Sequence, residues 1–404
     1  MASPRAPASA IRERNLASVL EALRERQPAA RADLAARTGL SKPTVGASLR
    51  SFEAAGLIRE FGRSTGRRGP AASLYELVPD AVLVLGIDIG ARYLRAVLAD
   101  LDGREVDEMS LRLPRARADD VIEGVRAIAE RMSARKSSVE LAVVGTPGVI
   151  DPASGRISAA PNIEGWDGVL AEHLLSDALG VPVLVENDVN LAALGEQQAG
   201  AGRDADSFAY LNIGSGLGAG IILHGTLHRG ARGAAGEVGF LPVGDDPFAR
   251  RHREHGGPME ERLSSHALVE IAKQMSNSTR STLQAPFDVQ AIFDSARRGD
   301  PLGRELVRYT AEQISVCVAG LTAVVDLELV LLGGGIGVNG DLLLADARAA
   351  TAKLVPAAPR IECASLGKHA ISTGAVAAGL EAARRRVLER IVGTGDGPSG
   401  STRA

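Results

Sequence analysis

The chain has 404 residues, of which 45% are hydrophobic and 24% are charged, and this composition is typical of a globular protein with two or three domains. Its formal net charge of −3 indicates neither a nucleic-acid nor a membrane partner, and no apolar run is long enough to span a bilayer. The charge is uneven, because residues 1–80 hold 13 Lys or Arg and 8 Asp or Glu, whereas the remainder holds 33 and 41. A basic module joined to an acidic body is a reason to look for DNA binding.

The basic module is predicted to be an all-α winged helix-turn-helix domain over residues 11–79, preceded by a disordered tail over residues 1–10. Apolar residues recur at helical spacing in the first helix until Pro28 ends the run. A short helix over 31–38 and a tight Gly-Leu turn lead to a third helix, which Ser41 caps. Two strand-like runs follow, joined by a basic glycine-rich loop that would form the wing. This order of elements is typical of DNA-binding domains.

Polar and basic side chains gather on the outward face of the third helix and on the wing. The predicted DNA contacts are Arg31, Ser41, Lys42, Thr44, Ala47, Arg50, Arg63, Arg67 and Arg68. Arginines on a flexible loop beside a recognition helix suit phosphate contacts or a narrow minor groove. Sequence readout is predicted to be weak, because Gly46 and Ala47 cannot reach a base edge by a hydrogen bond. The alternative is a three-helix protein-interaction module with a solvated basic loop.

One structural pattern recurs in the body of the chain, a buried strand that ends in a glycine-rich or Asp-bearing turn. Such turns occur at Asp88, Asp188, Gly214 and Gly333. Their backbone N–H groups can cradle phosphate, because a chain without a Cβ can approach an anion closely. A single glycine turn is more often structural than functional. The ordered set, however, is typical of a two-lobed, actin-like sugar kinase that holds sugar and nucleotide between its lobes.

The predicted fold class is therefore α/β, with a two-lobed actin-like body after the winged helix. The first lobe is predicted to span residues 81–198 and about 371–392, and the second lobe residues 199–370. Residues 393–404 have the composition of a disordered tail.

Asp188 is the candidate catalytic residue, because it follows a buried strand at the start of a helix. Open α/β sheets bind ligands at the carboxyl ends of their strands, which places this carboxylate at a binding crevice. The alternative is that Asn187 and Asp188 serve only to cap the helix.

Several motifs, in order, resemble those of the ROK family (repressors, open reading frames and sugar kinases). They read PGVID, PNIEGW, VENDVNLAALGE, NIGSGLGAG, GEVGF and LLGGG. The chain most resembles the repressor branch, which includes xylose repressors, because the family's kinases lack the winged helix. The resemblance covers about residues 11–390.

The resemblance implies a sugar site in which Asp188 takes the place of the kinase base. The implied sugar contacts are Asn162, Asn187, Asp188, Glu237, Phe240 and Glu260. Carboxylates and amides suit this task, since each can form paired hydrogen bonds to vicinal hydroxyls. Phe240 stands where the family has a histidine, so the effector could be an unusual sugar or an oligosaccharide that stacks on the ring.

The family's phosphate turn, Asp-x-Gly-Gly-Thr, is altered in this sequence. Ala91 and Arg92 stand in place of the second glycine and the threonine. Phosphoryl transfer depends on positioning, so we predict little or no kinase activity and a vestigial role for Asp188. The residues of the degraded nucleotide site are Gly90, Gly214, Gly216, Gly218 and Gly334. The sequence leaves open whether ATP still binds there.

The family's zinc site is also altered. Its histidine and three cysteines correspond to Phe240, Arg251, Arg253 and Pro258. A structural zinc needs four ligands at fixed spacing, so we predict no zinc and no other cofactor.

These patterns predict a sugar-responsive transcriptional regulator, most simply a repressor of carbohydrate uptake or catabolism genes. Its partners would be a double-stranded DNA operator, a sugar effector between the lobes and further copies of the chain in a homodimer or homotetramer. The isolated Cys317 and Cys363 fit a reduced cytoplasm, and we expect a nucleoid-associated protein without membrane contact. One alternative is an ATP-dependent, hexokinase-like sugar kinase that retains DNA binding. Another is a regulator that answers only to a protein partner.

Overall fold

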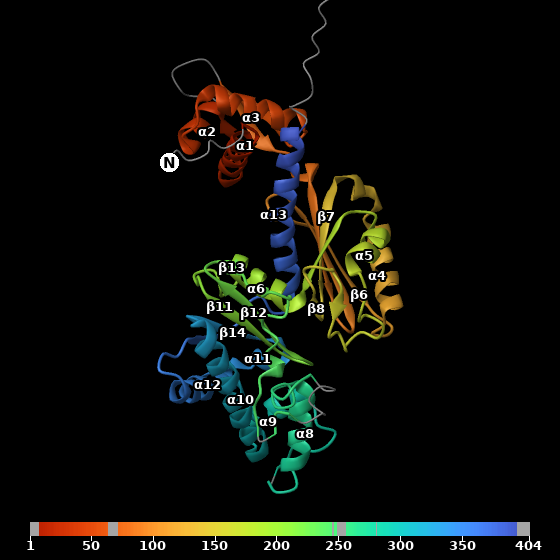
Figure 1. Cartoon of the computed structure of the whole chain (residues 1–404), viewed down its shortest axis with the longest axis vertical. Coiled ribbons are helices and arrows are strands. Elements are labelled where there is room, and N and C mark those ends of the chain that lie inside the picture. The colour runs from red at the N-terminus through yellow and green to blue at the C-terminus, as the bar shows by residue number, and fades with distance from the viewer. Residues whose placement is uncertain (1–7, 64–71, 245, 249–255, 280, 394–404) are drawn as a thin grey trace, which may run out of the picture.

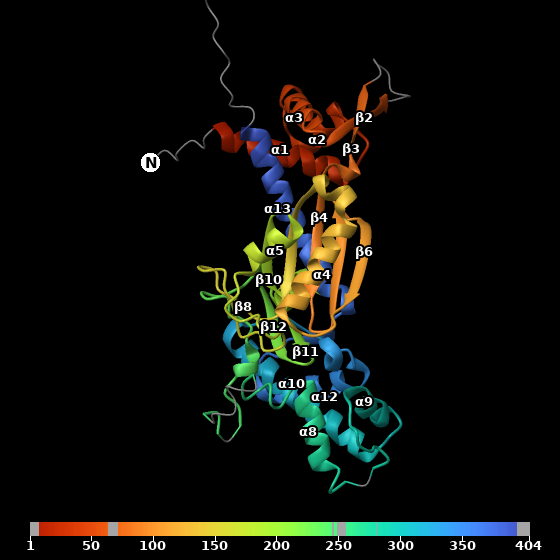
Figure 2. The same cartoon turned by 90° about the vertical axis from the view of Figure 1, so that its right-hand side faces the viewer.

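The structure is a computed structural model that describes residues 8–63, 72–244, 246–248, 256–279 and 281–393 (Figure 1). The molecule is elongated, with the winged helix at one end, a first lobe in the middle and a second lobe at the other end (Figures 1 and 2). Residues 8–10 and Gly393 are helical and do not belong to the predicted tails, because the first helix begins at Ala8 and the last ends at Gly393. The rest of both tails lies outside the described residues.

The amino-terminal domain combines three helices with the predicted wing. Its elements are α1 (Ala8–Glu25), β1 (Ala29–Ala30), α2 (Arg31–Thr38), α3 (Lys42–Ala54), β2 (Ile58–Arg63) and β3 (Ser73–Leu77). Gly39 ends α2 in the left-handed conformation, and Ser41 caps α3 by accepting a hydrogen bond from the Thr44 N–H at 3.2 Å. The domain is not purely helical, since β1 pairs with β3 beside β2. A two-residue strand has no periodic pattern, which is why the sequence did not predict β1.

The first lobe is built on a five-stranded sheet with the order β10-β7-β4-β5-β6. Its strands are β4 (Leu83–Ile89), β5 (Tyr93–Asp100), β6 (Glu105–Arg112), β7 (Val139–Thr146) and β10 (Val183–Asn187). A small hairpin of β8 (Val149–Ile150) and β9 (Ile157–Ser158) follows β7. Helices α4 (Ala118–Arg131) and α5 (Ala171–Leu179) cover one face of the sheet, and α13 (Ala370–Gly393) covers the other. Strand β4 is buried on both faces, which explains its continuous apolar sequence.

The second lobe repeats this topology in a sheet with the order β13-β12-β11-β14-β15. Its strands are β11 (Phe208–Ile213), β12 (Leu217–Leu223), β13 (Thr226–Leu227), β14 (Leu329–Gly333) and β15 (Arg360–Cys363). In each sheet, three successive antiparallel strands are joined by two later strands that run parallel to the first. The turns at Gly90 and Gly214 therefore occupy equivalent places in the two lobes.

The helices of the second lobe cover one face of its sheet and extend beyond it (Figure 1). They are α8 (Ser265–Met275), α9 (Val289–Arg297), α10 (Pro301–Val325), α11 (Gly334–Gly337) and α12 (Gly340–Leu354). No helix within the described ranges is long and apolar enough to cross a membrane.

Two helices, α6 (Asp188–Ala199) and α13, lie side by side between the two sheets (Figure 1). Helix α6 packs on β11 and β12, whereas α13 packs on β4 and β7. At their crossing, a Cβ added to Gly195 or Gly374 would overlap the backbone of the opposite helix. Glycine at both positions therefore permits the close approach. The predicted lobe boundary after residue 198 lies one residue before the end of α6, although α6 packs against the second sheet.

The core of the winged helix is continuous with the core beneath α13. One apolar cluster runs from Leu191 of α6 through Ala375 and Leu388 of α13 to Leu16 and Leu23 of α1. Helix α13 therefore connects the region between the lobes to the winged helix.

Candidate functional site

Four carboxylates lie close together where the lobes meet, and they come from both lobes. They are Asp88, Asp188, Glu237 and Glu260. Burial and the nearby carboxylates of Asp88 and Glu237 raise the pKa of Asp188 to about 7. Burial and Glu260 raise the pKa of Glu237, and burial raises the pKa of Glu260. A cluster of this kind costs free energy in the folded state, which is typical of a binding site.

Asp188 is placed by the end of strand β10 and the first turn of α6. Asn187 caps the helix, because its Oδ1 accepts hydrogen bonds from the N–H groups of Val189 and Asn190 at 2.9 and 3.0 Å. Its Nδ2 donates to the Gly148 carbonyl at 3.0 Å. The capping interpretation thus holds for Asn187, which keeps one amide hydrogen for a ligand. Asp188 is half-buried and lies among the carboxylates.

Glu237 and Glu260 approach the cluster from the second lobe. Glu237 directly precedes the 3-10 turn Val238–Phe240, and Glu260 accepts a hydrogen bond from the Leu217 N–H at 2.9 Å. Phe240 is 48% exposed, so its ring is available to a ligand at the rim. Asn162 is exposed on the loop after β9, and no hydrogen bond of the described residues joins it to the carboxylates.

The turn that the sequence analysis assigned to phosphate lies between β4 and β5. Ala91 and Arg92 are exposed, and the Gly90 N–H donates to the Tyr93 carbonyl at 3.0 Å. The Asp88 carboxylate, which is 3% exposed, accepts a hydrogen bond from the Arg95 guanidinium at 3.0 Å. Burial raises the pKa of Asp88 although this arginine lowers it. The sequence pattern did not single out Arg95, because a cation within a strand has no motif.

The two glycine turns of the second lobe differ from the prediction in one respect. Gly214 and Gly216 form the turn between β11 and β12, as expected. Gly218 instead lies within β12, where an added Cβ would contact Val189 of α6 at 3.4 Å. Gly218 is therefore not part of the turn itself, and its assignment to the nucleotide site stays a prediction.

Gly334 follows β14 with a φ of 75°, which favours glycine. An added Cβ would overlap the Ile213 carbonyl, so no other residue fits this turn. The Tyr210 hydroxyl accepts a hydrogen bond from the Gly334 N–H, and burial together with the Glu196 and Asp188 carboxylates raises the pKa of Tyr210.

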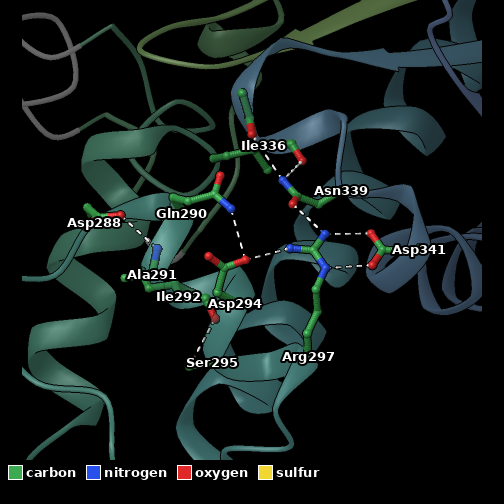
Figure 3. Close-up of polar contacts among 11 residues, drawn as sticks. Asp288, Gln290, Ala291, Ile292, Asp294, Ser295, Arg297, Ile336, Asn339 and Asp341 are labelled. Atoms are coloured by element: carbon green, nitrogen blue, oxygen red, sulfur yellow. Dashed lines mark hydrogen bonds and ion pairs between the residues drawn. The ribbon is translucent and has the colours of Figure 1, made fainter.

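A polar network holds the segment after Gly334 in place (Figure 3). Arg297 of α9 donates to both carboxylate oxygens of Asp341 at 2.8 Å and to Asn339 Oδ1 at 2.9 Å. Asn339 Nδ2 in turn donates to the Gly335 and Ile336 carbonyls at 3.1 and 3.0 Å. A bidentate Arg–carboxylate pair fixes orientation as well as distance, so α9 determines the position of α11.

Two further contacts connect the lobes beside the carboxylates. Arg229 of the second lobe forms an ion pair with Glu186 of β10 at 2.6 Å. The fully buried Glu196 of α6 accepts hydrogen bonds from the N–H groups of Ser365 and Leu366 at 2.9 and 2.8 Å. The hydrogen bonds of Glu196 fix α6 to the segment that leads into α13.

The predicted DNA-binding face lies on α3, with Lys42, Ala47 and Arg50 exposed. Gly46 is buried rather than outward-facing, because the exposed Arg31 of α2 lies over it. An added Cβ at Gly46 would lie 3.4 Å from the Arg31 side chain and 3.6 Å from that of Arg50. The guanidinium groups of Arg31 and Arg50 therefore both lie close to Gly46 on one face of the domain.

The structure describes three of the other predicted DNA contacts, and two lie outside the described residues. Ser41 and Thr44 bond to each other at 2.8 Å at the start of α3, and Arg63 is exposed at the end of β2. Arg67 and Arg68 lie outside the described residues.

The residues that the resemblance places at the family's zinc positions do not fit a zinc ion where the structure describes them. Phe240 and Pro258 have no side-chain donor atom, and Arg251 and Arg253 lie outside the described residues. The described part of the chain contains no group of three or more His, Cys, Asp or Glu that could hold a metal.

Comparison with known proteins identifies both parts of the molecule. A model of the ROK family matches residues 84–382, and a model of the MarR family matches residues 15–68. The chain belongs to the ROK family. This ROK protein is 26% identical to a putative xylose repressor of Caldicellulosiruptor sp. (strain Rt8B.4) over 354 residues, which cover 84% of the chain and 87% of the relative.

Solved structures confirm the two-lobed fold. A ROK family transcriptional regulator, described as a homologue of the E. coli MLC protein, is similar with a TM-score of 0.78 at 23% identity, covering 95% of this chain and 99% of the other. A ROK glucokinase from Streptomyces griseus, in complex with glucose and AMPPNP, has a TM-score of 0.63 at 28% identity and covers 74% and 99%. The ROK protein therefore has a kinase-like body and a winged helix.

Proposed function

We propose that this ROK protein is a transcriptional repressor that binds a DNA operator through its winged helix and a sugar between its lobes. The observation that carries the proposal is the continuous apolar core that joins α6, α13 and α1. Helix α6 begins at Asp188, and α1 belongs to the winged helix. A ligand at the carboxylates can therefore act on the winged helix through packed helices.

The winged helix supports DNA binding by its charge and its shape. Arg31 and Arg50 lie side by side on the exposed face, and Lys42 follows the capped start of α3. Guanidinium groups and helix N-termini are suited to phosphate contacts, which position a domain on DNA. The exposed Ala47 has no hydrogen-bonding side chain and can make few direct contacts with bases, so we expect DNA shape to contribute to specificity.

The carboxylates support a polyol ligand. Carboxylate oxygens accept pairs of hydrogen bonds from vicinal hydroxyls, and such bonds would replace the repulsion between Asp188 and its neighbours. Asp88 and Asp188 come from the first lobe and α6, whereas Glu237 and Glu260 come from the second lobe. A sugar that contacts both sets would favour a closed arrangement of the lobes.

Closure would reach the winged helix through the α6–α13 pair. The two helices touch backbone to backbone at Gly195 and Gly374, so neither can move far without the other. By linkage, the sugar and the operator must change each other's affinity by the same factor. We propose that the sugar weakens operator binding, so that it acts as an inducer.

A combined binding experiment tests this function. Genomic DNA fragments are pulled down with the purified protein, with and without a panel of sugars. We expect a few sites beside sugar-transport or glycosidase genes, and their recovery should change with one sugar. Recovery that is independent of sequence and sensitive only to salt would contradict the operator. An absence of any thermal shift across the sugar panel would favour the alternative regulator that answers to a protein partner.

A sugar kinase that retains DNA binding is the second candidate, favoured by Asp188 and by the similarity to glucokinases. Against it, Ala91 and Arg92 occupy the turn where phosphate would bind, and Arg95 pairs with the Asp88 carboxylate. ATP-dependent phosphorylation of a hexose, lost in Asp188→Ala, would establish this candidate. A nucleotide could still bind the Gly334 turn without transfer, which a titration with ATP would detect.

We further propose that the repressor acts as a homodimer or homotetramer without zinc, in the cytoplasm and in association with the nucleoid. Two winged helices would then read the two halves of a symmetric operator. Light scattering gives the subunit number, and elemental analysis of the purified protein measures bound zinc.

A further inference from the structure

A pocket of about 600 Å³ opens beside Glu260, next to the carboxylate cluster. Pro161 of the first lobe, the neighbour of Asn162, forms part of one wall. The other walls come from the second lobe, at the Ser215 turn, the segment 256–262, and helices α8 and α10. A single hexose ring at the carboxylates would not fill this pocket, whose volume lies within the usual range for small-molecule sites.

The walls combine apolar surface with a few hydrogen-bonding groups. Pro258 and Ile271 supply apolar surface, and Tyr309 of α10 is half-buried in the lining. The Tyr309 hydroxyl accepts a hydrogen bond from Arg262, which leaves its own proton free to donate to a ligand oxygen. Gln274 is exposed on α8 and presents an amide to the same space. Such a surface suits a sugar ring, which has apolar C–H faces and polar edges.

The described lining residues carry charges of both signs. Asp246, Glu260, Glu261 and Glu270 line the pocket together with Arg262 and His266, and Glu270 forms an ion pair with Lys273. Carboxylates can accept hydrogen bonds from the hydroxyls of a sugar.

We propose that this pocket binds a second sugar ring, so that the effector is a disaccharide or glycoside. The proposal rests on the proposed function, in which the first ring binds at Asp188 and Glu260. Glu260 lies on the border between the two sites, because it belongs to the carboxylates and also lines the pocket. The second ring would extend from Glu260 toward Tyr309 and Gln274.

Calorimetric titrations of the full chain with matched sugars test the proposal. The probes are glucose with maltose and cellobiose, and xylose with xylobiose. At least one disaccharide should bind roughly tenfold or more tightly than its monosaccharide. Gln274→Trp should fill the pocket and remove this difference, with little effect on the monosaccharide. Asn277→Trp is the matched control, since Asn277 is exposed on the following turn and does not line the pocket.

Tyr309→Phe provides a second variant that keeps the ring and removes the hydroxyl. We expect a loss of several-fold in disaccharide affinity and no change for the monosaccharide. Equal affinities of monosaccharides and disaccharides in the wild type would overturn the second ring and leave the sugar-responsive repressor intact. If Gln274→Trp lowered the affinities for monosaccharides and disaccharides equally, that result would also overturn the second ring. A chain that binds none of these sugars would overturn both proposals.

Discussion

Replacing Asp188 with Asn should separate the stability of the protein from its response to sugar. In the folded chain the Asp188 carboxylate is half-buried beside Asp88 and Glu237, and its pKa is raised from 3.8 to about 7. An asparagine keeps the oxygen that accepts the Val189 N–H at 2.9 Å, and it removes the charge. We therefore expect Asp188→Asn to stabilise the sugar-free protein and to weaken sugar binding.

The sign and size of the effect follow from the two pKa values. Between 3.8 and about 7, folded Asp188 retains a proton that the unfolded chain has released, so the free energy of unfolding falls as the pH rises through this window. The free-energy penalty for ionising Asp188 in the folded chain is complete above pH 7 and absent below pH 4. The full shift of about 3 pKa units corresponds to about 4 kcal/mol, and relaxation of a half-buried group reduces this to about 1–2 kcal/mol.

Urea unfolding of both proteins at pH 5 and pH 8, without sugar, measures this difference. We expect Asp188→Asn to gain about 1–2 kcal/mol at pH 8 and less than half of that at pH 5. Asp204→Asn is the control, because Asp204 is exposed and the change should have little effect at either pH. Sugar affinity should fall by roughly tenfold or more, since the ligand loses a charged acceptor. A variant that is less stable than the wild type at pH 8 would refute the reasoning.

Three further changes test the DNA face and the path between the sites. Arg31→Ala should weaken binding about equally on all DNA sequences and lower the slope of log affinity against log salt by about 1, as gel shifts at several salt concentrations would show. Gly374→Ala should lower the free energy of unfolding by about 1–3 kcal/mol, because its Cβ overlaps the backbone of α6. The same change at Gly393, which has no neighbour within 4 Å, should be near neutral in the same urea titration. Arg229→Ala removes the ion pair with Glu186 and should lower the free energy of unfolding by at most about 1 kcal/mol. It should also increase the separation of the two lobes measured by solution scattering. An unchanged scattering profile would contradict a role of Arg229 between the lobes.

Local patterns in the sequence were sufficient to predict the winged helix, the Asp-bearing turns and the glycine-rich turns. The cap at Ser41, the buried run of β4 and the helix that begins after Asn187 all appear as expected. Each depends on neighbours in the chain, so its signal is local. The wing strands were predicted for the same reason, whereas the short β1 was missed because it exists only by pairing with β3.

The roles of single glycines could not be predicted, because they depend on what lies across from them. Gly46 was assigned to the outward face, but it is buried under Arg31. Gly218 was grouped with the glycines of the turn, but it lies within β12 and faces Val189 of α6. The pairing of Asp88 with Arg95 and the network around Arg297 were missed for the same reason. Periodicity reports which residues are apolar or small, and not which partner each one meets.

The sequence by itself determined the family, the order of the domains and the chemistry of the carboxylates. These properties are recorded in residue types and in the spacing of motifs along the chain. Tertiary structure alone decided that α6 and α13 touch through Gly195 and Gly374, and that one core extends from this crossing to the winged helix. Residues 191 and 388 belong to the same cluster although nearly half the chain separates them. A contact between distant segments arises only when the folded chain buries their apolar faces together, and no local pattern encodes which faces will meet.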